Sequence, residues 1–407
     1  MTKNNKWIDL SILSLCTVGL LGVVLRTKIV FSLPFINYNH LLEAHSHFTF
    51  GGWVTLALMV MMVYELLPES YYKRCAYKWI LGSTAITAWG MLFAFLFWGY
   101  NSISIILSTI FIITTYIFGW NFIRDILKAK LGKSVLLLAV SSIFCLIISS
   151  SGPFLITYIY LTNSFKAILY RDALFTYLHF QYNGFFSLAI FALLFNHIGQ
   201  TITAGAKKNI SRFTVVLCVS IIPSLFLSYL WQDPDPVFRL FAIVGSCMVL
   251  LSFLLFVLAA RSLKSTYQDE EPVIRFLAFL SLGSFMLKLF LQCFTIFPEI
   301  GNAIFGNRPV IMGFLHLVFL GFVSLFILGF FAKKRLLDST RKFTRVVLVV
   351  FALAVIFNEA VLITQGLAAL FIPGNTIFPW LLWGAAIWLF AGTLLIAIAR
   401  IRTRQLQ

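Results

Sequence analysis

The chain alternates between long runs of apolar residues and short polar segments. Windows of about 20 apolar residues, the length that an α-helix needs to cross a bilayer, recur twelve times. They lie at residues 8–33, 41–66, 77–98, 101–123, 134–159, 172–196, 212–231, 237–260, 273–297, 309–332, 344–370 and 376–400. Every connection is short, and no internal repeat is evident. The pattern predicts an all-α, polytopic integral membrane protein with a single transmembrane domain over residues 1–407.

The composition supports this prediction. Of the 407 residues, 60% are hydrophobic and 17% are aromatic, more apolar surface than a soluble globular domain needs. The first apolar run lacks a small-residue cleavage signature, so we expect a retained helix and not a signal peptide. The six cysteines are scattered without paired or metal-binding spacing, which predicts neither a disulfide nor a zinc site.

The net charge of +17 resides mainly in short basic clusters between the apolar runs. Of the 31 lysines and arginines, 24 fall on the connections of one side, which places both termini on that side. Because lysine and arginine concentrate in cytoplasmic loops, both termini are predicted to be cytoplasmic. The expected partner of these charges is therefore the lipid bilayer and not nucleic acid. We expect a multi-pass protein of a bacterial inner (cytoplasmic) membrane.

Three predicted spans carry histidines at a similar depth: His45 and His47 in the second, His179 in the sixth and His316 in the tenth. Each lies about 4 to 8 residues, or about 6–12 Å, inside the predicted outer end. A polar ring within a membrane needs a partner, a ligand or a lined cavity. Helical bundles present neutral imidazoles to a porphyrin iron from facing helices. The spacing alone is equally compatible with helix–helix hydrogen bonds that involve no cofactor.

Neighbouring polar residues add to these histidines. The two histidines of the second span are separated by about 200° around a helix, so they cannot both face one iron. Tyr182 and Asn183 lie one turn beyond His179 and on its face. Glu43 lies one turn before His47 and either orients an imidazole as an acceptor or remains solvated at the interface.

The span count, the internal termini and the histidines of spans two, six and ten resemble the catalytic subunit of haem–copper oxidases and nitric oxide reductases. The run Gly19-Leu20-Leu21-Gly22-Val23-Val24-Leu25-Arg26 is similar to that family's first helix, and the stretch from His45 to Leu67-Pro68 resembles its second. Phe314-Leu315-His316 matches the second member of the family's tenth-helix His-x-His pair. The resemblance implies that His45 and His316 are the axial ligands of a low-spin haem b. Membrane haem and copper proteins of the nitric oxide response are similar in size, span count and histidine placement.

The same resemblance implies a copper ligand at His179, with Tyr182 near it and His47 lining an adjacent metal or gas site. However, Phe314 occupies the position of the histidine that holds the family's oxygen-reactive haem. Residues 215–231 contain no histidine, whereas the family has two copper ligands there. The loop between the last two spans lacks the family's arginine pair, so the propionate partners would be Arg26, Arg239 or Arg308. We therefore expect a bis-histidine haem protein with an incomplete dinuclear site. The implied activity is electron transfer, or the handling of nitric oxide or oxygen near the outer face. The implied partner is a redox protein or a small gas. Whether the protein is an oxidoreductase stays open.

Two further ionisable residues, Lys288 and Glu359, fall well inside their apolar runs. A lone ion at the bilayer centre costs about 2.5–3.5 kcal/mol on insertion scales. Their similar depth predicts either a buried ion pair that fixes helix packing or a proton path with Gln292 and Gln365. The alternative function is a cofactor-free transporter that uses Lys288, Glu359 and the buried histidines. A third possibility is a structural membrane partner whose histidines only bond to neighbouring helices.

Overall fold

The computed structural model describes residues 6–162, 164, 166–199, 202–232, 235–263, 268–301, 307–371 and 376–405. Within these residues the backbone is helical and contains no strand. Twelve helices or continuous helix series are long and apolar enough to cross a membrane. The prediction of an all-α fold is confirmed, and the twelve predicted spans correspond to twelve helices that could cross a membrane.

The spans are Lys6–Val30 (α1), Tyr38–Leu66 (α2, η1 and α3), Cys75–Trp98 (α5), Ser102–Ile126 (α6), Lys133–Leu161 (α7 and α8), Ala167–Ile198 (α9, η2 and α10), Ala204–Trp231 (α11 and η3), Pro236–Ser262 (α12), Pro272–Phe294 (α14), Arg308–Lys333 (α16, η4 and α17), Lys342–Ala368 (within α18, Lys342–Phe371) and Ile377–Gln405 (α19). The short helix α4 (Glu69–Tyr72) lies between α3 and α5. The seventh span begins eight residues before the predicted 212. The Thr203 hydroxyl caps α11 by accepting from the Ala206 N–H at 3.3 Å, so the helix extends through polar residues that hydropathy alone does not mark.

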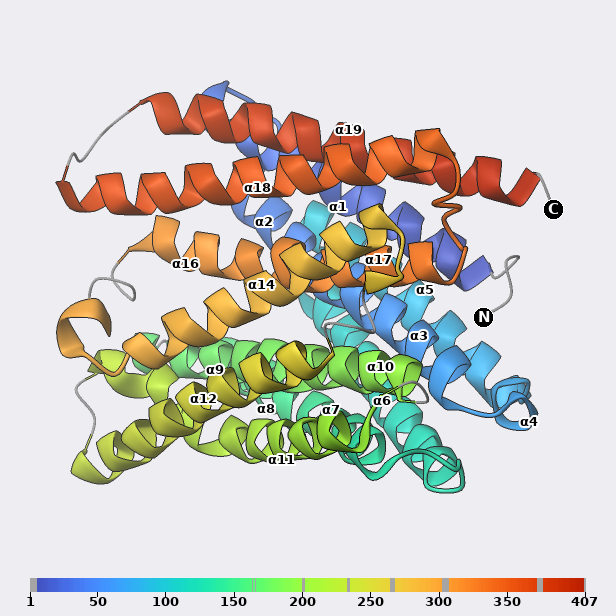
Figure 1. Ribbon diagram of the computed structural model, residues 1–407. Helices are drawn as coiled ribbons and strands as arrows, with labels where there is room; N and C mark the ends of the chain where they lie inside the picture. Colours follow the sequence, from blue (N-terminus) through green and yellow to red (C-terminus); the bar gives the residue numbers. More distant parts are fainter. Residues whose placement is uncertain are drawn as a thin grey trace. The chain divides into compact units, whose positions relative to one another are not determined.

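The chain forms two compact units. Unit 1 comprises Met1–Phe118, Glu271–Leu282 and Pro309–Gln407, and unit 2 comprises Gly119–Glu270 and Gly283–Arg308. In unit 1, α19 packs along both α1 and α18, and α2 packs on α5; Figure 1 shows α18 and α19 side by side at the red end of the sequence. In unit 2, α11 packs on α12 and α7 on α10. The single transmembrane domain over residues 1–407 stays a prediction.

Three spans contain a π-helical segment, and each segment begins close after a histidine. The segment η1 (Thr49–Thr55) begins two residues after His47, η2 (Phe180–Phe186) follows His179 directly, and η4 (Leu317–Ser324) follows His316 directly. No other span in the described parts of the chain has one. π-helical turns are rare in proteins overall, but they occur frequently at functional sites. His47, His179 and His316 are therefore candidate functional residues.

The same three positions share a sequence motif. A histidine is followed by an apolar residue, an aromatic residue at the third position, a glycine at the fifth and an aromatic residue at the sixth. The copies are His47-Phe48-Thr49-Phe50-Gly51-Gly52-Trp53, His179-Phe180-Gln181-Tyr182-Asn183-Gly184-Phe185 and His316-Leu317-Val318-Phe319-Leu320-Gly321-Phe322. Each copy lies in the second span of four consecutive spans. The chain therefore contains a threefold repeat of this histidine–glycine motif, which the expectation of no internal repeat overlooked.

The three motif-bearing spans are the most buried of the twelve. Their second halves are α3 (Leu56–Leu66), α10 (Ser187–Ile198) and α17 (Leu325–Lys333), in which nearly every side chain is buried. A helix that is apolar on all sides belongs in the interior of its bundle. The histidines therefore belong to spans whose second halves form the core of their units.

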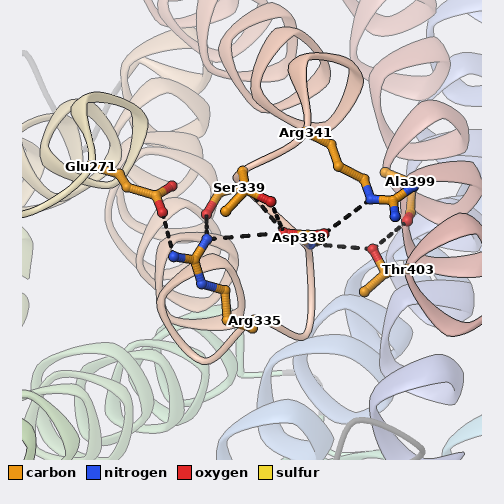
Figure 2. Close-up of polar contacts among 8 residues, drawn as sticks. Glu271, Arg335, Asp338, Ser339, Arg341, Ala399 and Thr403 are labelled. Carbon is orange, nitrogen blue, oxygen red and sulfur yellow. Dashed lines mark hydrogen bonds and ion pairs between the residues drawn. The ribbon is translucent and has the colours of Figure 1, made fainter. Parts of the chain in front are cut away.

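The connection between α17 and α18 is fixed by its backbone. The helix α17 ends in a Schellman motif, in which the Leu336 N–H donates to the Phe331 carbonyl at 2.9 Å and the Arg335 N–H to the Ala332 carbonyl at 3.0 Å. Arg335 has φ 56°, a left-handed conformation usually given to glycine. In Figure 2 its side chain reaches Glu271, at 2.6 Å, and Ser339, at 3.3 Å. These contacts explain why an arginine occupies a glycine-like position.

The Asp338 carboxylate accepts the side-chain hydrogen bonds of Thr340 and Arg341 in this connection. These bonds make the free energy of unfolding depend on pH. The Thr340 hydroxyl chiefly lowers the pKa of Asp338 below its ordinary 3.8, and Arg341, at 3.0 Å, lowers it further. Its stabilising effect is therefore fully present above pH 3.8 and is lost as the pH falls through the folded-state pKa. We expect Asp338→Asn to lower the free energy of unfolding by about 1 kcal/mol or less at pH 7, because the network is partly exposed. Thermal unfolding of the detergent-purified protein at pH 7 and pH 3 measures this difference.

The matched control is Glu69→Gln, which removes an exposed i,i+4 pair with Lys73 and is expected to change nothing measurable. If the Asp338→Asn difference were the same at both pH values, the carboxylate would not be the source of the stabilisation.

Candidate functional site

The first halves of spans two and ten are loosely packed. In α2 (Tyr38–Phe48) only Leu41, Ala44 and Phe48 are buried, and in α16 (Arg308–His316) only Gly313 is buried. His45 and His316, at the inner ends of these segments, are half-buried. Apart from Arg308, both segments belong to unit 1. Two core spans of unit 1 therefore leave their histidines incompletely covered by protein.

Just beyond the histidines, large side chains join the two spans. The rings of Phe50 and Phe319 meet edge to face with centroids 4.5 Å apart, and the Trp53 indole N–H donates to the Ser324 hydroxyl at 2.9 Å. Phe50 follows His45 by five residues and Phe319 follows His316 by three, or roughly 7.5 and 4.5 Å along a helix. The imidazoles of both spans therefore lie at a similar level, next to a fixed aromatic contact.

One nitrogen of the His316 ring forms a hydrogen bond. Its Nδ1–H donates to the Met312 carbonyl, one turn earlier in α16, at 2.7 Å. Because a carbonyl only accepts, this bond fixes the tautomer and leaves the lone pair on Nε2. No hydrogen bond to Nε2 is present among the described residues. Metal-binding histidines commonly hold their other ring nitrogen on a backbone carbonyl in this way.

His45 lies against α1 and near His316. Its Nδ1 is buried and has no hydrogen-bond partner among the residues that the structure describes, although the Val18 backbone lies within hydrogen-bonding reach of the ring. A Cβ at Gly22 would lie 3.7 Å from its Cε1. His45 is within electrostatic reach of His316, and Arg26 is within reach of both. Electrostatic interactions thus link His45 of α2, His316 of α16 and Arg26 of α1 within unit 1.

His47 faces a different neighbour, as its spacing from His45 predicted. Its ring stacks on Phe95 of α5 with centroids 4.1 Å apart, and its Nε2 lies 3.3 Å from the Tyr100 hydroxyl. Glu43 makes no hydrogen bond to His47 in the described part of the chain, and its Oε2 is buried without a partner. The second span therefore presents His45 to one site and His47 to a separate aromatic contact.

In unit 2, His179 is fully buried and both of its ring nitrogens are engaged. Nε2–H donates to the Ile221 carbonyl at 2.8 Å, and the Asn183 amide donates to Nδ1 at 3.0 Å. The Tyr182 ring lies 6.5 Å from the His179 ring between centroids. A metal at His179 would have to replace one of these hydrogen bonds, so the copper ligand at this position stays a prediction.

The remaining predicted residues are separated between the units. Arg239 and Arg308 belong to unit 2, whereas Arg26 belongs to unit 1 and interacts electrostatically with both imidazoles. Glu359 in unit 1 accepts from Asn358 at 3.1 Å, and its Oε2 is buried without a partner among the described residues. Lys288 belongs to unit 2, and its pairing with Glu359 stays a prediction.

His45 and His316 are two candidate nitrogen donors for a metal. Within the described residues, no group of three or more His, Cys, Asp or Glu side chains is arranged to hold a metal ion. A haem needs only two axial nitrogens from the protein, and His45 and His316 supply that number. The approach of Gly22 to the His45 ring and the Trp53–Ser324 bond were not anticipated from the sequence. The glycine that recurs five residues after His47, His179 and His316 was the signal that could have identified these segments.

No protein-family model matches the chain, and no curated protein matches it. Function is therefore inferred from the side chains themselves.

Proposed function

We propose that the protein binds a b-type haem between His45 and His316 and acts in electron transfer or in the handling of nitric oxide or oxygen. The observation that carries this proposal is the pair of half-buried imidazoles on two loosely packed core segments of unit 1, within electrostatic reach of each other. Histidines that serve only helix packing are expected to resemble His179, with both nitrogens bonded and no exposed surface.

The residues around the pair fit the group. Met312 holds the His316 ring so that Nε2 is available as a ligand, and His45 has an unpartnered nitrogen. Arg26 supplies a positive charge for a propionate, and Gly22 keeps α1 free of side-chain bulk beside the His45 ring. When bound, the iron would supply reversible one-electron chemistry. The protein would orient the ligands and exclude water from the inner side, where Phe50 and Phe319 meet.

The distribution of basic residues supports cytoplasmic termini, which would place this pair near the outer face of a bacterial cytoplasmic membrane. The partners would be lipid, a redox protein on that face, or a small gas. Arg239 and Arg308 remain candidates for further propionate contacts. Copper at His179 or His47 is proposed only as a second group, because a metal at either histidine would displace existing contacts.

The test is the reduced-minus-oxidised absorption spectrum of detergent-purified protein from haem-replete cells, with iron and copper analysis of the same sample. We expect a sharp low-spin b-type signal and about one iron per chain, as a bis-histidine site predicts. Colourless, iron-free protein would reject the haem proposal.

A cofactor-free transporter is the second candidate. Buried ionisable side chains of both units favour it: Glu359 has an unpartnered oxygen, and Lys288 is 1% exposed. Intramembrane ions of this kind often mark substrate or proton paths. Solute uptake by vesicles containing the purified protein, lost in Glu359→Gln but unchanged in His316→Ala, would favour this function over haem binding.

A further inference from the structure

Lys288 is a buried lysine of unit 2 whose side chain lies against two aromatic rings. It lies on α14, six residues before the helix ends at Phe294, and its side chain is 1% exposed. Its ammonium lies 5.7 Å from the centroid of the Tyr182 ring and 5.5 Å from that of Phe285. Among the described residues, these two aromatic faces are the contacts of the ammonium. Two aromatic faces only partly offset the loss of hydration of a buried ammonium.

The polar groups around this lysine are neutral. His179 lies within electrostatic reach of Lys288, and its Nδ1 accepts from Asn183 while its Nε2–H donates to Ile221. A ring with one donating and one accepting nitrogen is an uncharged imidazole. His179 therefore supplies no counter-charge to Lys288.

Gln292 provides a second unsatisfied group on the same face of α14. It lies one turn after Lys288 and is 7% exposed, and its Oε1 is buried without a partner among the described residues. A primary amide turned by half a rotation presents N–H donors in place of this oxygen. The ammonium and the amide can then donate to one small acceptor located between them.

We propose that Lys288 and Gln292, beside Tyr182, form a binding site for a small monovalent anion within unit 2. The anion supplies the counter-charge that the ammonium lacks, and the amide donates to it. The surrounding rings of Tyr182 and Phe285 restrict the site to a compact anion. This site is separate from the His45 and His316 pair and does not depend on the proposed haem.

The test uses the purified full-length protein at constant ionic strength, with chloride replacing the bulky anion gluconate. We expect chloride to raise the melting temperature saturably, because a ligand that binds only the folded state multiplies the folded-to-unfolded ratio by 1 + [L]/Kd, or about 100-fold at 100 times Kd. Equilibrium dialysis with radioactive chloride should show about one saturable site per chain. A wild-type protein without saturable binding of chloride or nitrate overturns the proposal.

Variants assign the site. Lys288→Gln should abolish the chloride-dependent increment, Lys288→Arg should retain part of it, and Gln292→Leu should weaken binding about tenfold, the loss of one hydrogen bond to a charged group. The matched control is Lys207→Gln, which removes an exposed charge of unit 2 and should leave chloride binding intact. Full binding by Lys288→Gln overturns the proposal. The proposal is also overturned if the double variant Lys288→Glu with Glu359→Lys regains the stability that either single variant loses, because that result would show that the two side chains neutralise each other. The haem spectrum of each variant is recorded, so failure of this site is distinguishable from failure of the haem proposal.

Discussion

His45→Ala and His316→Ala should each abolish stable haem binding, with a loss of affinity of at least about 100-fold. Replacing groups that only orient a metal ligand already costs about 10–100-fold, and these variants remove a ligand itself. Neither ring is central to packing, since both are half-buried, so we expect the variants to fold. The haem-to-protein absorbance ratio and the low-spin signal of the purified variants measure the effect.

The controls use the other membrane histidines. His47→Ala should keep the haem, because its ring stacks on Phe95 and not on the site shared with His316. His179→Ala should also leave the low-spin haem in place, but it should destabilise the protein, since the Asn183 amide and the Ile221 carbonyl lose their buried partner. If both His45→Ala and His316→Ala retained full haem, the ligand assignment would be wrong.

Gly184→Ala should destabilise unit 2 by about 1–3 kcal/mol, the usual cost of overpacking a tight core. A Cβ at Gly184 would lie 2.4 Å from the Cβ of Cys145 on α7. Both atoms belong to rigid parts of the structure, so neither can move aside without a shift of η2 or α7. Thermal unfolding of the purified variant against wild type measures the loss.

The clash also predicts which second change restores stability. Cys145→Gly should recover much of the loss in the Gly184→Ala background, because it removes the opposing Cβ, whereas Cys145→Ala should not. Gly283→Ala in α14 is the control, since nothing lies within 4 Å of its added Cβ, and it should be neutral or slightly stabilising. Equal losses for Gly184→Ala and Gly283→Ala would show that helix propensity, and not the close approach, is responsible.

The three copies of the histidine–glycine motif differ at one informative position. Four residues after the histidine, the copies have Gly51, Asn183 and Leu320. Asn183 can donate to the ring one turn before it, and it does so at 3.0 Å. Neither glycine nor leucine has a side-chain donor, so His47 and His316 must find other partners. This local difference is readable from the sequence once the repeat is recognised.

The sequence alone determined the number of helices long and apolar enough to span a membrane, because crossing a bilayer demands about 20 apolar residues. The depth of the histidines and the side of the termini stay predictions from that pattern and from the charge of the connections. It also separated His45 from His47, since their angular spacing follows from helix geometry. Its resemblance to a haem-binding family supplied the hypothesis of a ligand pair, which stays a proposal.

The tertiary structure decided what each imidazole contacts. His179 reaches the Ile221 carbonyl on another helix, whereas His45 and His316 interact electrostatically although their helices are far apart in sequence. Contacts of this kind depend on which helices pack together and at what rotation, and apolar helices of similar composition carry little local information about either. Hydropathy therefore places a histidine within an apolar helix, but the packing of other helices determines whether its nitrogens are satisfied or left available for a ligand.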